Sequence, residues 1–148
     1  MIAVKVQGLI LDSQQNPLLL LVDLEETIVL PISIGFWEGQ AIALKLRGHV
    51  LPRPITYDLI KSLCSQLGTV VKKVVVTDIK ENTFYAEIRL ETGKEKKLVV
   101  DARPSDAVGL ALTVGCPIYI TSKVAACTVS LKSLMNKGDF DKGGSKLH

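Results

Sequence analysis

Cysteine and long apolar runs are scarce in this chain of 148 residues. The three cysteines are odd in number and include no CxxC pair, which argues against a disulfide framework and against a zinc site. No apolar run approaches the roughly 20 residues that a membrane-spanning helix requires, and the first residues lack the charged head and continuous apolar stretch of a signal peptide. We therefore expect a cytoplasmic protein that does not enter a membrane.

A surplus of charge is also missing from most of the chain. The formal net charge is +3, and residues 123–148 account for all of it with five lysines and two aspartates. Residues 1–122 are neutral overall, so only a segregated arrangement of their charges could give a strong, sequence-independent hold on nucleic-acid phosphates. Because residues 123–148 are polar and rich in lysine and glycine, we expect a flexible tail after a domain at residues 1–122.

Hydrophobic periodicity predicts strands and helices in mixed order. The predicted strands are residues 2–11, 18–24, 27–32, 70–79, 84–90 and 97–102, with a last strand in CPIYI. The predicted helices are residues 35–48, 57–67 and 105–114. Several links have hairpin length, which favours a single compact α+β domain with a mixed or antiparallel sheet and about three helices over a doubly wound sheet.

Polar residues gather where the third helix begins, in the stretch DARPSDAVGLAL at residues 101–112. Strand side chains alternate between faces, so Asp101 and Arg103 are expected on one side of the strand end. Ser105 is a candidate helix cap, and Asp106 lies in the first turn, where the helix dipole favours a negative charge by about 0.3–1 kcal/mol. Capping and dipole effects alone account for Ser105 and Asp106 without any function.

The stretch RPITYD repeats this arrangement at the second helix. It supplies Arg53, a candidate cap at Thr56 and an acid in the first turn, Asp58, while Glu38 lies near the start of the first helix. Carboxylates a few ångströms apart can bind Mg²⁺ or Mn²⁺, and such metals activate water for phosphodiester cleavage. Arginine suits the phosphate because its planar fork binds two oxygens at once. Alternatively, each acid is a dipole partner or a member of a salt bridge.

Two neighbouring pairs of aromatic residues, Phe36–Trp37 and Phe84–Tyr85, bear on nucleic-acid binding. In each pair we expect one ring to face the core. The other ring, Trp37 or Tyr85, is then a candidate for the rim of the polar cluster, where it could stack on a base.

Four stretches resemble the bifunctional nuclease domain family, formerly catalogued as a domain of unknown function. They are PISIGFWEGQAIALKLRG, PRPITYDLI, NTFYAEIRL and DARPSDAVGLAL…PIYI, and the similarity runs in order from near Met1 to about Ser122. The resemblance implies a compact α+β domain, usually a homodimer, that cleaves both DNA and RNA. The apolar stretch PLLLLVDL, residues 17–24, would form an edge strand that benefits from being covered. By position, the family's polar residues correspond to Glu38, Arg53, Asp58, Asp101, Arg103, Ser105 and Asp106.

One departure from the family concerns position 57, where the family often has histidine and this chain has tyrosine. Tyrosine, with a reference pKa near 10, is a poor general base at neutral pH, whereas histidine suits that task. If the histidine acts in catalysis, this chain is impaired. His49 is close in sequence and is a candidate substitute.

Two hypotheses follow. The first is a metal-assisted nuclease acting on DNA or RNA, in which Arg53 and Arg103 hold phosphate and Mg²⁺ or Mn²⁺ is the cofactor; its catalytic residues are Glu38, Asp58, Asp101 and Asp106. The second is a non-catalytic, structural or regulatory homodimeric module in which the same residues form an arginine–carboxylate network.

Overall fold

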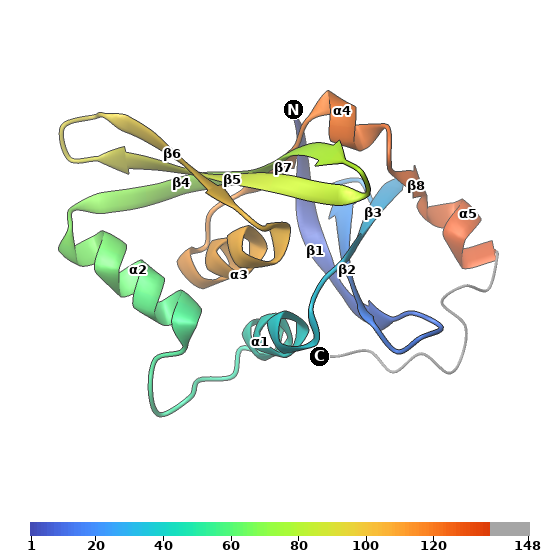
Figure 1. Cartoon of the computed structure of the whole chain (residues 1–148), viewed down its shortest axis with the longest axis horizontal. Helices are drawn as coiled ribbons and strands as arrows, with labels where there is room; N and C mark the ends of the chain where they lie inside the picture. Colours follow the sequence, from blue (N-terminus) through green and yellow to red (C-terminus); the bar gives the residue numbers. More distant parts are fainter. Residues whose placement is uncertain (137–148) are drawn as a thin grey trace.

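Eight strands form one mixed β-sheet in the order β6-β5-β4-β7-β1-β2-β3-β8 (Figure 1). The computed structural model describes residues 1–136. Only β4 and β7 pair in parallel, and every other neighbouring pair is antiparallel. The strands are β1 (Ile2–Leu11), β2 (Pro17–Asp23), β3 (Ile28–Ser33), β4 (Thr69–Lys80), β5 (Thr83–Thr92), β6 (Lys97–Ala102), β7 (Ile118–Ile120) and β8 (Val129–Ser130).

Three helices of 11 residues each pack on this sheet: α1 (Phe36–Leu46), α2 (Thr56–Gln66) and α3 (Pro104–Val114). The short helices α4 (Ser122–Ala125) and α5 (Leu131–Asn136) follow β7. Helix α3 lies between α1 and α2 and packs against β4 and β5 (Figure 1). The prediction of a single compact α+β domain with a mixed sheet and three main helices is therefore confirmed. Within residues 1–136, no helix is long and apolar enough to cross a membrane.

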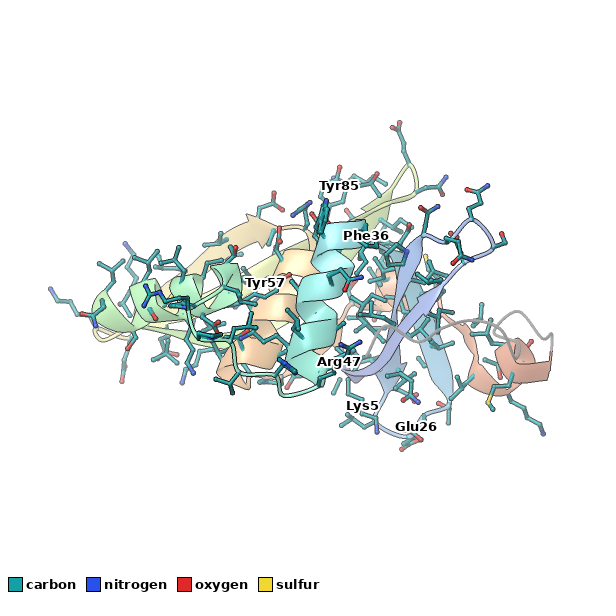
Figure 2. All side chains as sticks on the ribbon, turned by 90° about the horizontal axis from the view of Figure 1, so that it is seen from below. Lys5, Glu26, Phe36, Arg47, Tyr57 and Tyr85 are labelled. Carbon is teal, nitrogen blue, oxygen red and sulfur yellow. The ribbon has the colours of Figure 1, made fainter. Side chains whose placement is uncertain are left out.

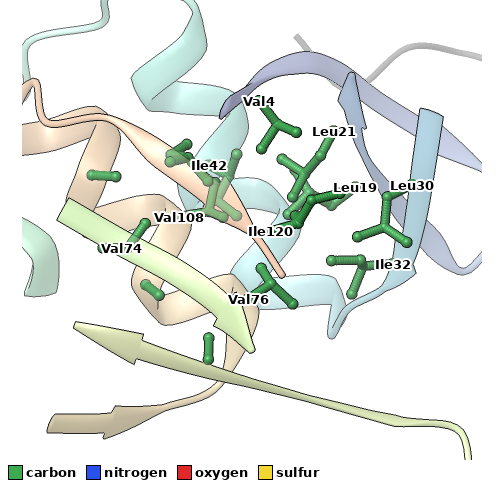
Figure 3. Close-up of a cluster of buried hydrophobic side chains, with 14 of the residues drawn as sticks. Val4, Leu19, Leu21, Leu30, Ile32, Ile42, Val74, Val76, Val108 and Ile120 are labelled. Atoms are coloured by element: carbon green, nitrogen blue, oxygen red, sulfur yellow. The ribbon is translucent and has the colours of Figure 1, made fainter. Parts of the chain in front are cut away.

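The main core lies between α3 and the sheet. Its side chains include Val108 of α3, Val74 and Val76 of β4, and Leu19 and Leu21 of β2, all fully buried (Figure 3). Because α3 is apolar on all sides and contains several small residues, it can approach the strands and both neighbouring helices closely.

Strand β2 is an inner strand, so the prediction that PLLLLVDL forms an edge is wrong. It pairs with β1 on one side and with β3 on the other. Leu19 and Leu21 face the main core, while Leu20 and Val22 face a second cluster that Leu131 and Leu134 partly cover. A continuous apolar run is typical of a strand buried on both faces, which is the situation here.

The fold continues beyond residue 122, where the sequence analysis placed the end of the domain. Thr121 caps α4 by accepting a hydrogen bond from the Val124 N–H, and β8 pairs with β3. These elements are short and contain polar residues, so their periodicity gave no signal. The domain therefore extends at least to Asn136, and the rest of the predicted tail, 137–148, lies outside the described residues.

Tyr57 of α2 and Gly109 of α3 fix how closely these two helices approach. The Tyr57 ring is buried, and a Cβ atom added at Gly109 would lie 2.1 Å from its Cζ. No side chain other than hydrogen fits at position 109 while the ring keeps this place.

Gly109→Ala should therefore destabilise the protein, although alanine in a helix interior usually stabilises by about 0.5–1 kcal/mol relative to glycine. We expect a loss of about 1–3 kcal/mol in the free energy of unfolding, measured by urea denaturation, because the core is overpacked. In a Tyr57→Leu background the same substitution should cost much less. An equal cost in both backgrounds would show that the Tyr57 ring is not the obstacle.

Candidate functional site

Arg103 joins the first turns of two helices. Its Nε and Nη2 donate to the two carboxylate oxygens of Asp106, at 2.8 and 3.2 Å, and its Nη1 donates to Oε1 of Glu38 at 3.1 Å. Asp106 lies in the first turn of α3 and Glu38 in the first turn of α1. We call Glu38, Arg103 and Asp106 the Arg103 cluster. The structure thus brings together three of the residues that the sequence analysis selected.

The Arg103 cluster is open to solvent. The Arg103 side chain is 63% exposed, and Asp106 and Glu38 are partly exposed. Hydrogen bonds to Asp106, and then to Glu38, raise the pKa of Arg103 further above its usual range, so the guanidinium is always charged. Two carboxylates against one guanidinium give the cluster a formal charge of −1 when all three groups are ionised.

The Glu38 carboxylate occupies its position because residue 35 is a glycine and has no side chain there. The carboxylate folds back over Gly35, the residue before α1, so that a Cβ atom at Gly35 would lie 2.0 Å from Oε2. The sequence analysis missed this role of Gly35. The feature of the sequence that could have indicated this role is a glycine at the start of the helix, three residues before the glutamate.

Tyr57 of α2 is buried against α3 (Figure 2) and lines one pocket together with the residues of the Arg103 cluster. Its hydroxyl donates to the carbonyl oxygen of Ser105 at 3.4 Å. Burial, and then the charges of Asp106 and Glu38, raise the pKa of Tyr57 to about 12. The phenol therefore stays protonated at neutral pH and does not act as a general base.

Arg103 lines two pockets. One pocket, of about 350 Å³, is lined by Trp37, Tyr57 and all three residues of the Arg103 cluster. The other, of about 620 Å³, is mostly apolar, with Phe84 in its wall and polar groups from Ser33, Asn82 and Thr83. Arg103 thus lines two spaces that could each receive part of a ligand.

The aromatic pairs differ from expectation at one point. Trp37 is 78% exposed, and Phe36 is exposed as well, with its ring packed edge-on against Trp37 at 5.0 Å between centroids. The expectation that one ring of this pair faces the core is wrong. In the second pair, Phe84 packs against the core and Tyr85 is exposed. Trp37 is therefore the ring at the rim of the smaller pocket.

Asp58 and Arg53 lie apart from the Arg103 cluster. Asp58 forms an ion pair with Lys45 of α1 and accepts a hydrogen bond from the Ile55 N–H at 3.0 Å. The hydrogen bond from Lys45 lowers the pKa of Asp58. Arg53 lines a third pocket, of about 350 Å³, together with Asp58, Lys45 and His49. The sequence analysis missed Lys45, because nothing in its spacing indicated which acid it would meet.

Asp101 lies on the edge strand β6, opposite Glu87 of β5, and forms no ion pair with the described residues. The four predicted carboxylates therefore do not converge. Among residues 1–136, no group of three or more His, Cys, Asp or Glu side chains is placed to hold a metal ion. Glu38 and Asp106 are the two that share a partner.

The two predicted helix caps are wrong. The residue that precedes α2 is Ile55, with Thr56 already inside the helix, and the residue that precedes α3 is Arg103. Ser105 is the second residue of α3 and is buried. Proline is favoured at the first position of a helix, so Pro104 starts α3 before the serine is reached. Asp58 takes over part of the capping of α2 by accepting the Ile55 N–H.

Comparison with known proteins identifies the family of this chain. The family model described as Bifunctional nuclease domain matches residues 19–131. The chain belongs to the bifunctional nuclease domain family. It is 44% identical over 124 residues to an uncharacterized protein found in two strains of Mycobacterium tuberculosis, covering 83% of this chain and 73% of the relative.

Plant relatives are more distant. A protein named Bifunctional nuclease 1 of Oryza sativa subsp. japonica is 27% identical over 100 residues, covering 66% of this chain and 30% of the relative. Bifunctional nuclease 2 of Arabidopsis thaliana has the same identity and coverage. The chain thus spans about a third of the length of these plant proteins.

The Lys45–Asp58 pair predicts a pH dependence of stability. The pKa of Asp58 is lower in the folded chain than its unfolded value near 3.9. Its contribution is therefore fully present above that value and is lost as the pH falls through the folded pKa. Thermal unfolding measured between about pH 5 and pH 2 should show a shallower acid loss for Asp58→Asn than for the native chain. The exposed Glu25, changed to Gln, serves as the control, and an equal effect of both substitutions would contradict the assignment.

Proposed function

We propose that this chain is a nuclease that cleaves phosphodiester bonds of DNA or RNA at the Arg103 cluster. The observation that carries the proposal is the exposed side chain of Arg103, a residue that lines two pockets. A phosphate of a nucleic acid has a nucleoside on each side, and the two pockets offer room for both. Membership of the bifunctional nuclease domain family and the names of the plant relatives support the proposal.

Arg103 keeps donors for a phosphate while it binds both carboxylates. A guanidinium has five N–H groups, and three of them bind Asp106 and Glu38. The remaining two lie on the terminal nitrogens, which are the atoms that bind phosphate oxygens. The carboxylates hold the guanidinium in place and leave these two N–H groups available.

The charge of the cluster favours a divalent cation as cofactor. With a formal charge of −1, the cluster alone repels a phosphodiester. Mg²⁺ is usually held in enzymes by one or two carboxylates together with substrate phosphate and water, so the pair of Glu38 and Asp106 fits it without a third acid. When bound, Mg²⁺ or Mn²⁺ supplies charge stabilisation and an activated water. Asp58 and Asp101 lie outside this pair and have other partners or positions.

Exposure of the cluster favours catalysis over the alternative of a structural arginine–carboxylate network. Exposed ion pairs contribute about 0–1 kcal/mol to stability, whereas breaking a buried pair costs about 3–5 kcal/mol. An arginine whose side chain is 63% exposed is poorly placed to hold the fold together. The two functions therefore predict different outcomes for the same substitution.

Asp106→Asn should lower the cleavage rate by about 100-fold or more, because it removes one of the two carboxylates that would hold the divalent cation, and with it the charge stabilisation that the cation would supply. The melting temperature should change little, and EDTA should abolish cleavage by the native chain. Calorimetric titration with Mg²⁺ or Mn²⁺ should show binding that Asp106→Asn loses.

The control for this experiment is Asp58→Asn, which removes the same charge outside the Arg103 cluster. Full activity of Asp106→Asn in protein free of contaminating nuclease would refute the proposal. A sharp fall in melting temperature without metal binding would favour the structural module.

Trp37 should favour single-stranded substrates, because paired bases in a duplex are not available to stack on it. We expect Trp37→Ala to raise KM for a single-stranded oligonucleotide by roughly 5- to 150-fold, the equivalent of about 1–3 kcal/mol per stacked base. The kcat should change little, since stacking acts equally on the bound substrate and the transition state. Trp37→Phe keeps a ring and serves as the control. An equal rise in KM on duplex and single strand would contradict stacking.

A further inference from the structure

A pocket of about 430 Å³ lies over strands β4, β5 and β6 and shares no lining residue with the two pockets at Arg103. Helix α3 packs on one face of β4 and β5 (Figure 1), and Ile88 of β5 points to that face, where it packs against the main core. Its neighbour Arg89 therefore points to the opposite face, because side chains alternate along a strand. The charged residues that line this basic pocket are Lys72, Lys73, Arg89, Lys97 and Glu91.

A β-bulge brings two consecutive lysines to the same side of β4. The register of β4 against β5 shifts between Val71 and Lys73, which leaves Lys72 as an extra residue, and Lys73 then pairs with Arg89. Val71 and Val74, on either side of the two lysines, are both buried. The bulge thus lets both lysines line one pocket, whereas consecutive residues of a regular strand point to opposite faces.

Glu91 is the only acid among the residues that line the basic pocket. Its Oε2 is 4.0 Å from Nζ of Lys72, and it lies opposite Lys97 in the β5–β6 pair, so one carboxylate lies near two lysines. Arg89 has an acid of its own, Glu87, whose Oε2 accepts from Nε and Nη2 at 3.2 and 3.1 Å. With Glu87 included, four cations face two acids, which gives a formal charge of +2.

Lys73 is the cation that has no acid beside it. Within residues 1–136 it forms no ion pair, and its Nζ lies 5.6 Å from the centroid of the Tyr119 ring. A cation–π contact leaves the charge of the ammonium group in place. Lys73 and Arg89 are also direct partners across two strands, and like charges in that position are destabilising. A bound anion would remove this repulsion.

We propose that the basic pocket binds a compact polyphosphate, such as the diphosphate group of a nucleoside diphosphate. A charge of +2 suits an anion with two or more charges. The pocket volume lies within the range of small-molecule sites, about 300–1,000 Å³. Leu98 and Val99, which are 36% and 59% exposed, line the same pocket and offer apolar contact to the uncharged part of the ligand.

The spacing of the cations favours a diphosphate over the backbone of a nucleic-acid strand. Cα atoms of neighbouring residues in a chain, or of partners in an antiparallel pair, are about 4–6 Å apart, so Lys72, Lys73 and Arg89 start from adjacent positions. The two phosphates of a diphosphate share one oxygen, whereas a strand carries one phosphate per nucleotide. Three adjacent cations therefore match the diphosphate better.

Titration calorimetry of the full chain in EDTA and at low salt tests the proposal. We expect saturable binding of pyrophosphate and of ADP, weaker binding of AMP, and no binding of adenosine. Added NaCl should weaken the binding, because salt screens exposed charges. Lys73→Gln should raise the Kd for pyrophosphate by about tenfold, because it removes a charged donor.

Lys80→Gln is the matched control. Lys80 also lies on β4 and over a tyrosine ring, with Nζ 5.2 Å from the centroid of Tyr85, but it does not line the basic pocket. Its substitution should leave the Kd unchanged. Thermal unfolding at low salt gives a second readout. Pyrophosphate should raise the Tm of the native chain and of Lys80→Gln more than that of Lys73→Gln, and Lys73→Gln should not lower the Tm of the free chain.

Three outcomes would overturn the proposal. The first is no binding of pyrophosphate up to about 1 mM, or the same Kd for the native chain and Lys73→Gln. The second is tighter binding of a single-stranded oligonucleotide than of pyrophosphate, which would assign the pocket to a strand. The third is a marked fall in the Tm of free Lys73→Gln, which would contradict the repulsion between Lys73 and Arg89. No measurement involves cleavage, so failure here is distinct from failure of the proposed function.

Discussion

The close packing of α3 between α1, α2 and the sheet is the constraint on which the rest of this structure depends. Val108 and Ala111 are buried, and Gly109 lets the Tyr57 ring of α2 lie against the helix backbone. Because α3 is held on three sides, its first turn has a fixed position relative to the first turn of α1. Arg103 can then reach Glu38 and Asp106 at once. The geometry of the polar cluster is thus a consequence of apolar packing.

Most of the fold could be predicted from the sequence because most elements bury one face against a single core. Alternation along β1 and the helical spacing in α1 report that burial directly. Two strands were not predicted correctly. Strand β2 was expected at an edge, although it is apolar on both faces and lies inside the sheet, and β8 was missed because it is too short to show a period. The prediction also failed at the helix starts, where Pro104 outweighed the capping preference of Ser105. Local sequence preference thus predicts that a helix or strand is present better than it predicts the residue at which the element begins.

The candidate site could be predicted only in part, for a different reason. Acids in the first turns of the helices, with arginines nearby, indicated the right kind of residue. Arg103 does donate hydrogen bonds to both Glu38 and Asp106. Sequence spacing gives the face of an element but not the direction in which that element points. Asp58 therefore looked equivalent to Asp106, although in the folded chain it forms an ion pair with Lys45 of α1. Which of several similar acids converge is decided by tertiary packing.

The neutral body of the chain constrains how a nucleic acid could be held. Residues 1–122 carry no net charge, and the Arg103 cluster carries one negative charge more than positive. The Arg103 cluster itself therefore does not attract a phosphate backbone over a long range. At the cluster the interactions are short-ranged: two guanidinium N–H groups, the exposed ring of Trp37 and, in the proposed function, a cation that Glu38 and Asp106 would hold. Each of these acts on one nucleotide unit, so such a site would select a local, unpaired segment rather than a length of duplex.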